Sequence, residues 1–176
     1  MTCGCGSNSS PMRIEPTHIP DVLLLKRERF VDSRGWSTEL HNEASLHAVR
    51  FDVRFVQDNL SRSEPGVLRG LHFQRDPEQG KLVTCLAGRI YDVAVDLRPG
   101  SSTFGQHVSV ELNADEGDSL WVPAGFAHGF LVLGSEPAWL RTRWINTAPP
   151  PASGALSGTT PPLRSRGRSR PRTSLV

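Results

Sequence analysis

Short apolar runs recur between residues 82 and 133, and turn-forming residues separate them. The runs are rich in Val, Ile, Leu and Phe and cover residues 82–86, 90–97, 107–112, 120–122 and 130–133. The separating segments contain Gly, Pro, Ser, Asn and Asp. Short strands at such regular spacing are typical of β-sandwiches and β-barrels. The pattern therefore predicts an all-β protein.

Two segments before this series have weaker patterns. Residues 43–51 place Ala44, Leu46 and Val49 on one face, which predicts a short helix, and a strand is expected over 54–59. No run approaches the roughly 18 apolar residues that a membrane span needs. The first ten residues lack the basic start and apolar block of a signal peptide. We therefore expect a cytoplasmic protein with no membrane partner.

The charge is distributed unevenly along the chain. Residues 1–136 contain 13 Lys and Arg and all 18 Asp and Glu, a net charge of −5, whereas residues 137–176 contain 7 Arg and no acid. The segment after Trp144 has no apolar periodicity and holds 6 of the 14 prolines, so it is not expected to pack. We predict a loose extension over residues 1–11, a folded domain over 12–144 and a disordered tail over 145–176. Met1 and Met12 both remain open as the start of translation.

The strand-like segment R-G-L-H holds the first candidate site residues, Arg69 and His72. Strict alternation would place these two side chains on opposite faces of a strand. A glycine inside a strand can mark a β-bulge that re-aims a side chain. A bulge at Gly70 would therefore allow Arg69 and His72 to share a face.

A second histidine, His128, lies between two strand-like runs, in the stretch A-H-G-F. Taken alone, His72 or His128 fits a hydrogen-bonded core residue better than a functional one. Together with Arg69 and Lys81, the two histidines would be an unfavourable way to fill a core, but they suit an anionic substrate held beside a base.

Metal binding is the competing functional hypothesis, because small β-barrels often hold metals through histidines. The sequence has no H-x-H pair, and the other four histidines have no ligand-like spacing to His72 and His128. No metal site is predicted.

Five stretches, in order, resemble the dTDP-4-dehydrorhamnose 3,5-epimerase family. They are IPDVLLLKRERFVDSRGWSTE (19–39), FVQDNLSRSEPGVLRGLHFQ (55–74), QGKLV (79–83), GRIYDVAVDLRPGSSTFG (88–105) and LWVPAGFAHGF (120–130). The resemblance implies a cupin-type double-stranded β-helix, or jelly roll. It also implies an isomerase that needs no metal or other cofactor and forms a homodimer through its N-terminal strands.

The resemblance further implies a reaction. Members of the family convert dTDP-4-dehydro-6-deoxy-glucose to dTDP-4-dehydro-L-rhamnose, in dTDP-L-rhamnose biosynthesis, by removing protons at C5 and C3 beside the ketone. His72 would be the base, and Lys81 would stabilise the enolate oxygen. The implied substrate contacts are Arg34, Glu39, Gln57, Asp58, Asn59, Arg69 and His128. Each of these residues alone would fit an ordinary structural role, and their ordered occurrence favours the site.

The resemblance ends near the basic tail. The family has a tyrosine, its general acid, thirteen residues after the A-H-G-F histidine, and this chain has Arg141 there. The one tyrosine of this chain is Tyr91. The final strands and helices of the family have no counterpart in this sequence after Trp144. We therefore expect a domain that is incomplete at its C-terminal end and impaired in activity. A shift of the reading frame near codons 137–141 would explain both the break and the tail.

Three alternatives stay open. A related dTDP-sugar 3- or 5-epimerase or ketoisomerase would share the motifs, and a non-catalytic cupin could bind the nucleotide sugar without converting it. The arginines of residues 164–172 could bind nucleic acid. Because no aromatic residues lie between them, they fit a solvated tail better.

Overall fold

The computed structural model describes residues 12–147, and it contains twelve strands and one short helix in that range. The strands are β1 (Met12–Pro16), β2 (Leu23–Arg27), β3 (Phe30–Asp32), β4 (Gly35–Ser37), β5 (Gln57–Ser63), β6 (Leu68–His72), β7 (Lys81–Ala87), β8 (Arg89–Asp96), β9 (His107–Asn113), β10 (Ser119–Val122), β11 (Phe126–Leu133) and β12 (Ala138–Trp144). The predicted all-β class is confirmed. The extension predicted over 1–11, and the predicted tail from residue 148 onward, lie outside the described residues.

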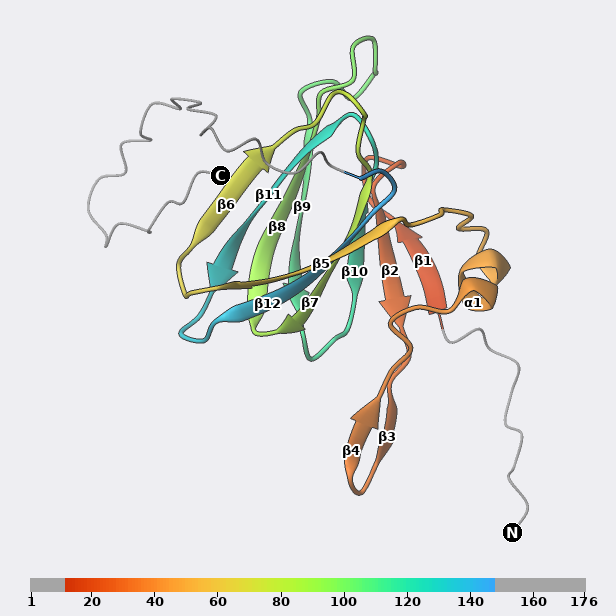
Figure 1. Cartoon of the computed structure of the whole chain (residues 1–176), viewed down its shortest axis with the longest axis vertical. Coiled ribbons are helices and arrows are strands. Elements are labelled where there is room, and N and C mark those ends of the chain that lie inside the picture. Colours follow the sequence, from red (N-terminus) through yellow and green to blue (C-terminus); the bar gives the residue numbers. More distant parts are fainter. Residues whose placement is uncertain (1–11, 148–176) are drawn as a thin grey trace.

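Two antiparallel sheets make up the body of the molecule (Figure 1). The six-stranded sheet has the order β1-β2-β10-β7-β12-β5, and the four-stranded sheet has the order β6-β11-β8-β9. A hairpin of β3 and β4 extends away from this body (Figure 1). Most neighbours in the sheets are distant in sequence, so the space between the sheets collects side chains from the whole domain.

The apolar core identifies the inner face of each strand. A cluster that includes Val83 and Cys85 of β7, Ile90 of β8 and Leu140 of β12 fills the space between the sheets. A second cluster, on the outer face of the six-stranded sheet, includes Leu82 and Trp121 and is covered by Leu46 and Phe51. Because side chains alternate along a strand, Lys81 shares the inner face with Val83, and Arg141 shares the outer face with Arg143.

The helix and two strand limits differ from the expectations. The helix α1 (Glu43–Ala48) begins where Asn42 accepts hydrogen bonds from two backbone N–H groups, and it ends before the predicted residue 51. β5 begins at Gln57 rather than at residue 54. His128, which was expected between two strands, lies inside β11, because residues 126–129 pair with β8 despite the flanking glycines Gly125 and Gly129.

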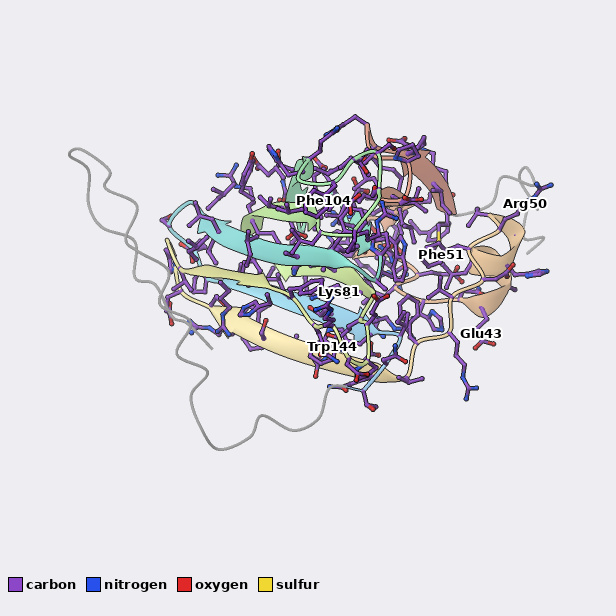
Figure 2. All side chains as sticks on the ribbon, turned by 90° about the horizontal axis from the view of Figure 1, so that it is seen from above. Glu43, Arg50, Phe51, Lys81, Phe104 and Trp144 are labelled. Carbon is purple, nitrogen blue, oxygen red and sulfur yellow. The ribbon has the colours of Figure 1, made fainter. Side chains whose placement is uncertain are left out.

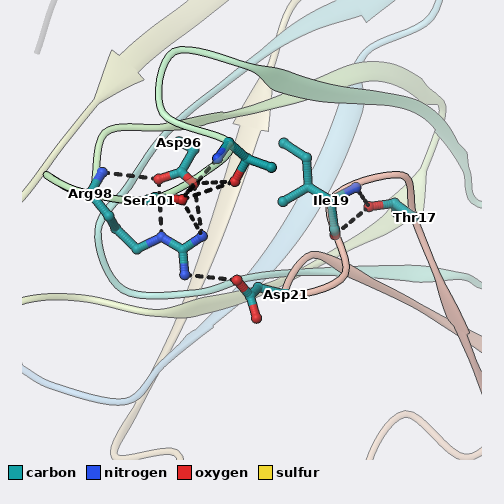
Figure 3. Close-up of polar contacts among 7 residues, drawn as sticks. Thr17, Ile19, Asp21, Asp96, Arg98 and Ser101 are labelled. Carbon is teal, nitrogen blue, oxygen red and sulfur yellow. Dashed lines mark hydrogen bonds and ion pairs between the residues drawn. The ribbon is translucent and has the colours of Figure 1, made fainter.

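Asp96 holds the loop that follows β8 (Figure 3). Its buried carboxylate accepts hydrogen bonds from the side chains of Arg98, Ser101 and Thr103, and Arg98 also pairs with Asp21. The hydrogen bond from Arg98 is the largest cause that lowers the pKa of Asp96 far below its usual range. Both carboxylate oxygens therefore serve the structure of this loop.

The described structure continues past Trp144, although the tail is predicted to begin at residue 145. The backbone N–H of Ile145 donates to the carbonyl of Gly80 at 3.2 Å, and the carbonyl of Asn146 accepts from Gln79 at 3.0 Å. The Asn146 side chain donates to the carbonyl of Glu78 at 2.6 Å. These bonds attach the end of β12 to the segment that precedes Lys81.

Candidate active site

Strands β6 and β11, which carry His72 and His128, approach each other very closely. A Cβ at Gly70 would lie 2.6 Å from the Cα of Gly129, and a Cβ at Gly129 would lie 2.7 Å from the carbonyl oxygen of Arg69. Only glycines fit at such a contact. This explains why glycine follows Arg69 in one motif and His128 in the other.

The pairing between these strands is irregular at the same point. His72 pairs with His128, whereas Arg69 pairs with Phe130, so β6 contains one residue more than β11 between the two pairs. The predicted bulge is therefore confirmed. Because Phe130 belongs to the core between the sheets, Arg69 and His72 both lie on the inner face.

Arg69 connects the two sheets. Its Nε donates to Ser63 Oγ at 2.9 Å, and a terminal nitrogen donates to the carbonyl of Arg62 at 3.3 Å. Ser63 is buried at the end of β5, on the other sheet. A guanidinium held in this way presents its remaining N–H groups in a fixed direction, which suits an anionic group of a ligand.

His128 has a buried partner that the sequence analysis did not single out. Its Nε2 lies 2.6 Å from Oδ1 of Asp92, and neither residue is exposed. The other oxygen of Asp92, Oδ2, is buried and has no hydrogen-bond partner among residues 12–147. Asp92 and Asp96 are both buried acids of β8, but Asp96 is fully used by its loop, whereas Asp92 faces the site.

Lys81 and His72 also lie on the inner face. Together with Arg69 and His128 they form what we call the inner polar group. Lys81 is 8% exposed, and burial lowers its pKa, while the charge of Asp92 opposes that change. His72 is more open to solvent. Even so, desolvation is the first cause that lowers the pKa of His72, followed by repulsion from Lys81, His128 and Arg69. The lowered pKa of His72 favours the uncharged imidazole, the form that can accept a proton.

The triplet 57–59 divides between the two faces of β5. Gln57 and Asn59 lie on the inner face, where Gln57 Nε2 donates to Asn59 Oδ1 at 2.9 Å. Asp58 lies on the outer face and pairs with Arg141 at 2.6 Å and with Arg143 at 3.0 Å. The structure thus brings Gln57 and Asn59, but not Asp58, to the inner group.

A family model described as dTDP-4-dehydrorhamnose 3,5-epimerase matches residues 16–142. The chain belongs to this family. Similar epimerases include that of Shigella flexneri, 51% identical over 127 residues, with 71% of this chain and 70% of the relative covered. The Escherichia coli K12 enzyme is 52% identical over 124 residues, with 69% and 67% covered.

Solved structures of the epimerase family agree with the fold. The Legionella pneumophila enzyme, in complex with dTDP-4-keto-L-rhamnose, has a TM-score of 0.73 and 43% identity, and the match covers 78% of this chain and 73% of that one. The Bacillus anthracis enzyme, with TDP and PPi bound, has a TM-score of 0.74 and 41% identity, with 78% and 79% covered. The predicted cupin-type jelly roll is confirmed.

Arg34 and Glu39 lie apart from the inner polar group, although the resemblance to the epimerase family implies that both contact the substrate. Arg34 is at the tip of the β3–β4 hairpin, 88% exposed, and pairs with Asp32 at 2.6 Å. Glu39 accepts hydrogen bonds from Asn42 and Ser45 at the start of α1. Neither residue contacts the inner polar group of its own chain.

Arg141, which the motif spacing places where the epimerase family has its tyrosine, also lies apart from the inner polar group. Arg141 lies on the outer face of the six-stranded sheet, against Asp58, and not beside His72. Tyr91 is exposed on the outer face of the four-stranded sheet, since Ile90 and Asp92 on either side of it face inward. Within residues 12–147, no tyrosine therefore lies next to the proposed base.

Other features of the described residues do not belong to this site. A hollow of about 650 Å³ lies between α1 and the outer face of the six-stranded sheet, lined by residues that include His41, His47, Phe55 and Arg143. No group of three or more His, Cys, Asp and Glu in the described part of the chain is arranged to hold a metal ion. The helix found there is too short to cross a membrane.

Proposed function

We propose that this chain binds a dTDP-linked 4-keto-6-deoxy sugar between its two sheets and removes the proton at C5, and then at C3, as a dTDP-4-dehydrorhamnose 3,5-epimerase. The observation that carries the proposal is the inner polar group, in which His72, Lys81, His128 and Arg69 converge within the fold of this family. The substrate would be dTDP-4-dehydro-6-deoxy-glucose and the product dTDP-4-dehydro-L-rhamnose.

His72 is the proposed base. Its lowered pKa keeps the imidazole neutral, so it can take a proton from the carbon beside the ketone. The electron pair of the broken C–H bond moves to the ketone oxygen and gives an enolate. Lys81, buried on the inner face, supplies a positive charge for that oxygen in surroundings of low dielectric.

The remaining inner residues are proposed to hold the nucleotide sugar. Arg69, fixed by Ser63, suits the diphosphate, and His128 is held by Asp92. Gln57 and Asn59 offer amide groups to the sugar from the opposite sheet. Asp58 contributes indirectly at most, since its carboxylate is paired on the other face of the strand.

Epimerisation also requires a proton to return to the opposite face of the carbon. With Arg141 on the outer face, the described residues place no tyrosine for this step. An arginine would not serve in any case, because it stays protonated at neutral pH. We therefore propose that this chain exchanges the C5 hydrogen faster than it forms the epimerised product.

One assay tests these proposals. The chain is incubated with dTDP-4-dehydro-6-deoxy-glucose in deuterated water, and deuterium at C5 and C3 and the epimerised product are measured separately. His72→Asn should reduce the exchange by a factor on the order of 10² to 10⁴. Unchanged exchange in this variant would show that His72 is not the base. Incorporation at a single carbon would favour a monoepimerase, and binding without exchange would favour a non-catalytic cupin.

A homodimer is the proposed assembly. The hairpin side chains Phe30, Val31 and Trp36 are 50%, 75% and 53% exposed, and such a cluster of apolar side chains on a projecting hairpin suits a protein interface. In this dimer, the hairpin carries Arg34 to the inner polar group of the partner. A cytoplasmic location likewise stays a prediction, which cell fractionation would check.

A further inference from the structure

Two buried hydrogen-bond donors lie side by side on the inner face of the six-stranded sheet. Asn59 Nδ2, on β5, and Trp144 Nε1, on β12, are both buried and have no hydrogen-bond partner in the described part of the chain. Trp144 pairs with Gln57, so Asn59 is its diagonal neighbour on the same face. A buried N–H without an acceptor costs free energy, and such groups in folded proteins usually have a partner.

Lys81 extends these donors into a row across three strands. It pairs directly with Trp144 on the side away from β5, and Figure 2 shows the two labelled side chains in the same region of the molecule. The row Asn59, Trp144 and Lys81 therefore presents nitrogen donors to the space between the sheets. Its one side-chain acceptor, Asn59 Oδ1, already accepts a hydrogen bond from Gln57 at 2.9 Å.

The position of Trp144 is well fixed by its backbone. Its carbonyl accepts from the N–H of Val56 at 2.8 Å, and the next residue, Ile145, donates to Gly80 at 3.2 Å. Gly80 itself has no room for a side chain, since a Cβ there would lie 2.7 Å from the ring of Trp121. The backbone of Trp144 is thus held next to that of Lys81 by bonds on both sides of the strand.

We propose that Trp144 is a ligand-binding residue, whose indole N–H donates a hydrogen bond to an oxygen of the sugar ring substituents, in a row with Asn59 and Lys81. This inference rests on the proposed function, because Lys81 is there assigned to the ketone oxygen of the same sugar. The diphosphate is assigned to Arg69, which Ser63 holds at the other end of β5, so the sugar is the part of the ligand left for the indole.

The test compares two ligands in two matched variants by isothermal titration calorimetry. Trp144→Phe removes the N–H and keeps an aromatic ring, and Trp139→Phe makes the same change on the exposed outer face of the same strand. For dTDP-D-xylose, Trp144→Phe should raise Kd by about three- to tenfold, the effect of one hydrogen bond. For dTDP, which lacks the sugar, neither variant should differ from the unaltered chain by more than about twofold.

Equal affinities of Trp144→Phe and Trp139→Phe for dTDP-D-xylose would overturn the inference and leave the proposed function intact. If the unaltered chain bound neither ligand, the proposed function would fail, and the inference with it. A second measurement uses the unaltered chain, so it does not depend on whether a variant folds. Among the indole N–H signals of the four tryptophans, one should shift with dTDP-D-xylose and not with dTDP. The absence of any such shift would also contradict the proposal.

Discussion

At the scale of single residues, the charge of Lys81 acts on His72 through the space between the sheets. Burial is the larger cause that lowers the pKa of His72, and the positive charge of Lys81 is the second. A base that must be neutral benefits from both effects. Its working range extends to lower pH, because the acid limb of the rate profile follows the pKa of the base.

Lys81→Met should therefore raise the pKa of His72 relative to the unaltered chain, since it removes the repulsion and keeps a side chain of similar length. The pKa should remain below its usual value, because burial still acts. Titration of the His72 ring by NMR measures the change. Arg89→Met, on an exposed pair with Glu111, is the control and should leave the titration of His72 unchanged. A pKa of His72 that falls or stays constant in Lys81→Met would refute the coupling.

Asp92 is the second residue with a clear expectation. Asp92→Asn keeps the size of the side chain but weakens the hydrogen bond with His128, so unfolding in urea should show a loss of about 1–3 kcal/mol. Glu111→Gln removes the charge of an exposed acid and should change stability by less than about 0.5 kcal/mol. Equal effects of the two substitutions would mean that the buried pair has no special role.

At the scale of elements, the contact of β6 with β11 sets the position of the base. Gly129→Ala would bring a methyl group to 2.7 Å from the backbone of Arg69, so β6 must move, and His72 with it. We expect a loss of about 1–3 kcal/mol in stability together with loss of C5 exchange. Gly100→Ala is the control.

A Cβ at Gly100 meets nothing within 4 Å, although φ there is +82°. Gly100→Ala should therefore lower stability by about 1–2 kcal/mol through backbone strain alone and leave exchange unchanged. If Gly129→Ala kept the exchange rate of the unaltered chain, the close contact would not be what positions His72.

The sequence predicted best those strands whose local pattern of apolar residues is strong. Apolar runs located β7 to β10 to within a residue or two, and the mid-strand glycine of β6 indicated the bulge. β12 was not predicted, and the first half of β11 was missed, because Gly125 and Gly129 resemble a turn while the strand there depends on two neighbours. Alternation along 57–59 could have separated Asp58 from the site.

The alternation of Ile90, Asp92, Ala94 and Asp96 was the signal for a buried acid in β8. The same pattern could not distinguish an acid that faces the site from one that holds a loop. That difference depends on Arg98, Ser101 and Thr103, whose positions come from the fold.

At the scale of the whole molecule, the location of Arg34 gives a test of the proposed dimer. If Arg34 acts in the site of the partner, Arg34→Ala and His72→Asn should each be poorly active, whereas mixed dimers contain one complete site. Co-expression of the two variants should then restore about a quarter of the unaltered exchange rate, since half of the dimers are mixed. No recovery in mixed dimers, with dimers confirmed by sedimentation, would place Arg34 in the site of its own chain or in neither.

The order of strands in the larger sheet also matters while the chain is being synthesised. Among the described residues, β5 is joined to that sheet through β12 alone, and β12 is the last strand to leave the ribosome. At 5–20 residues per second, β5 waits for several seconds with unpaired backbone groups. The nascent chain is therefore exposed to misassociation until β12 emerges, and slower translation of the codons between β5 and β12 would prolong that interval.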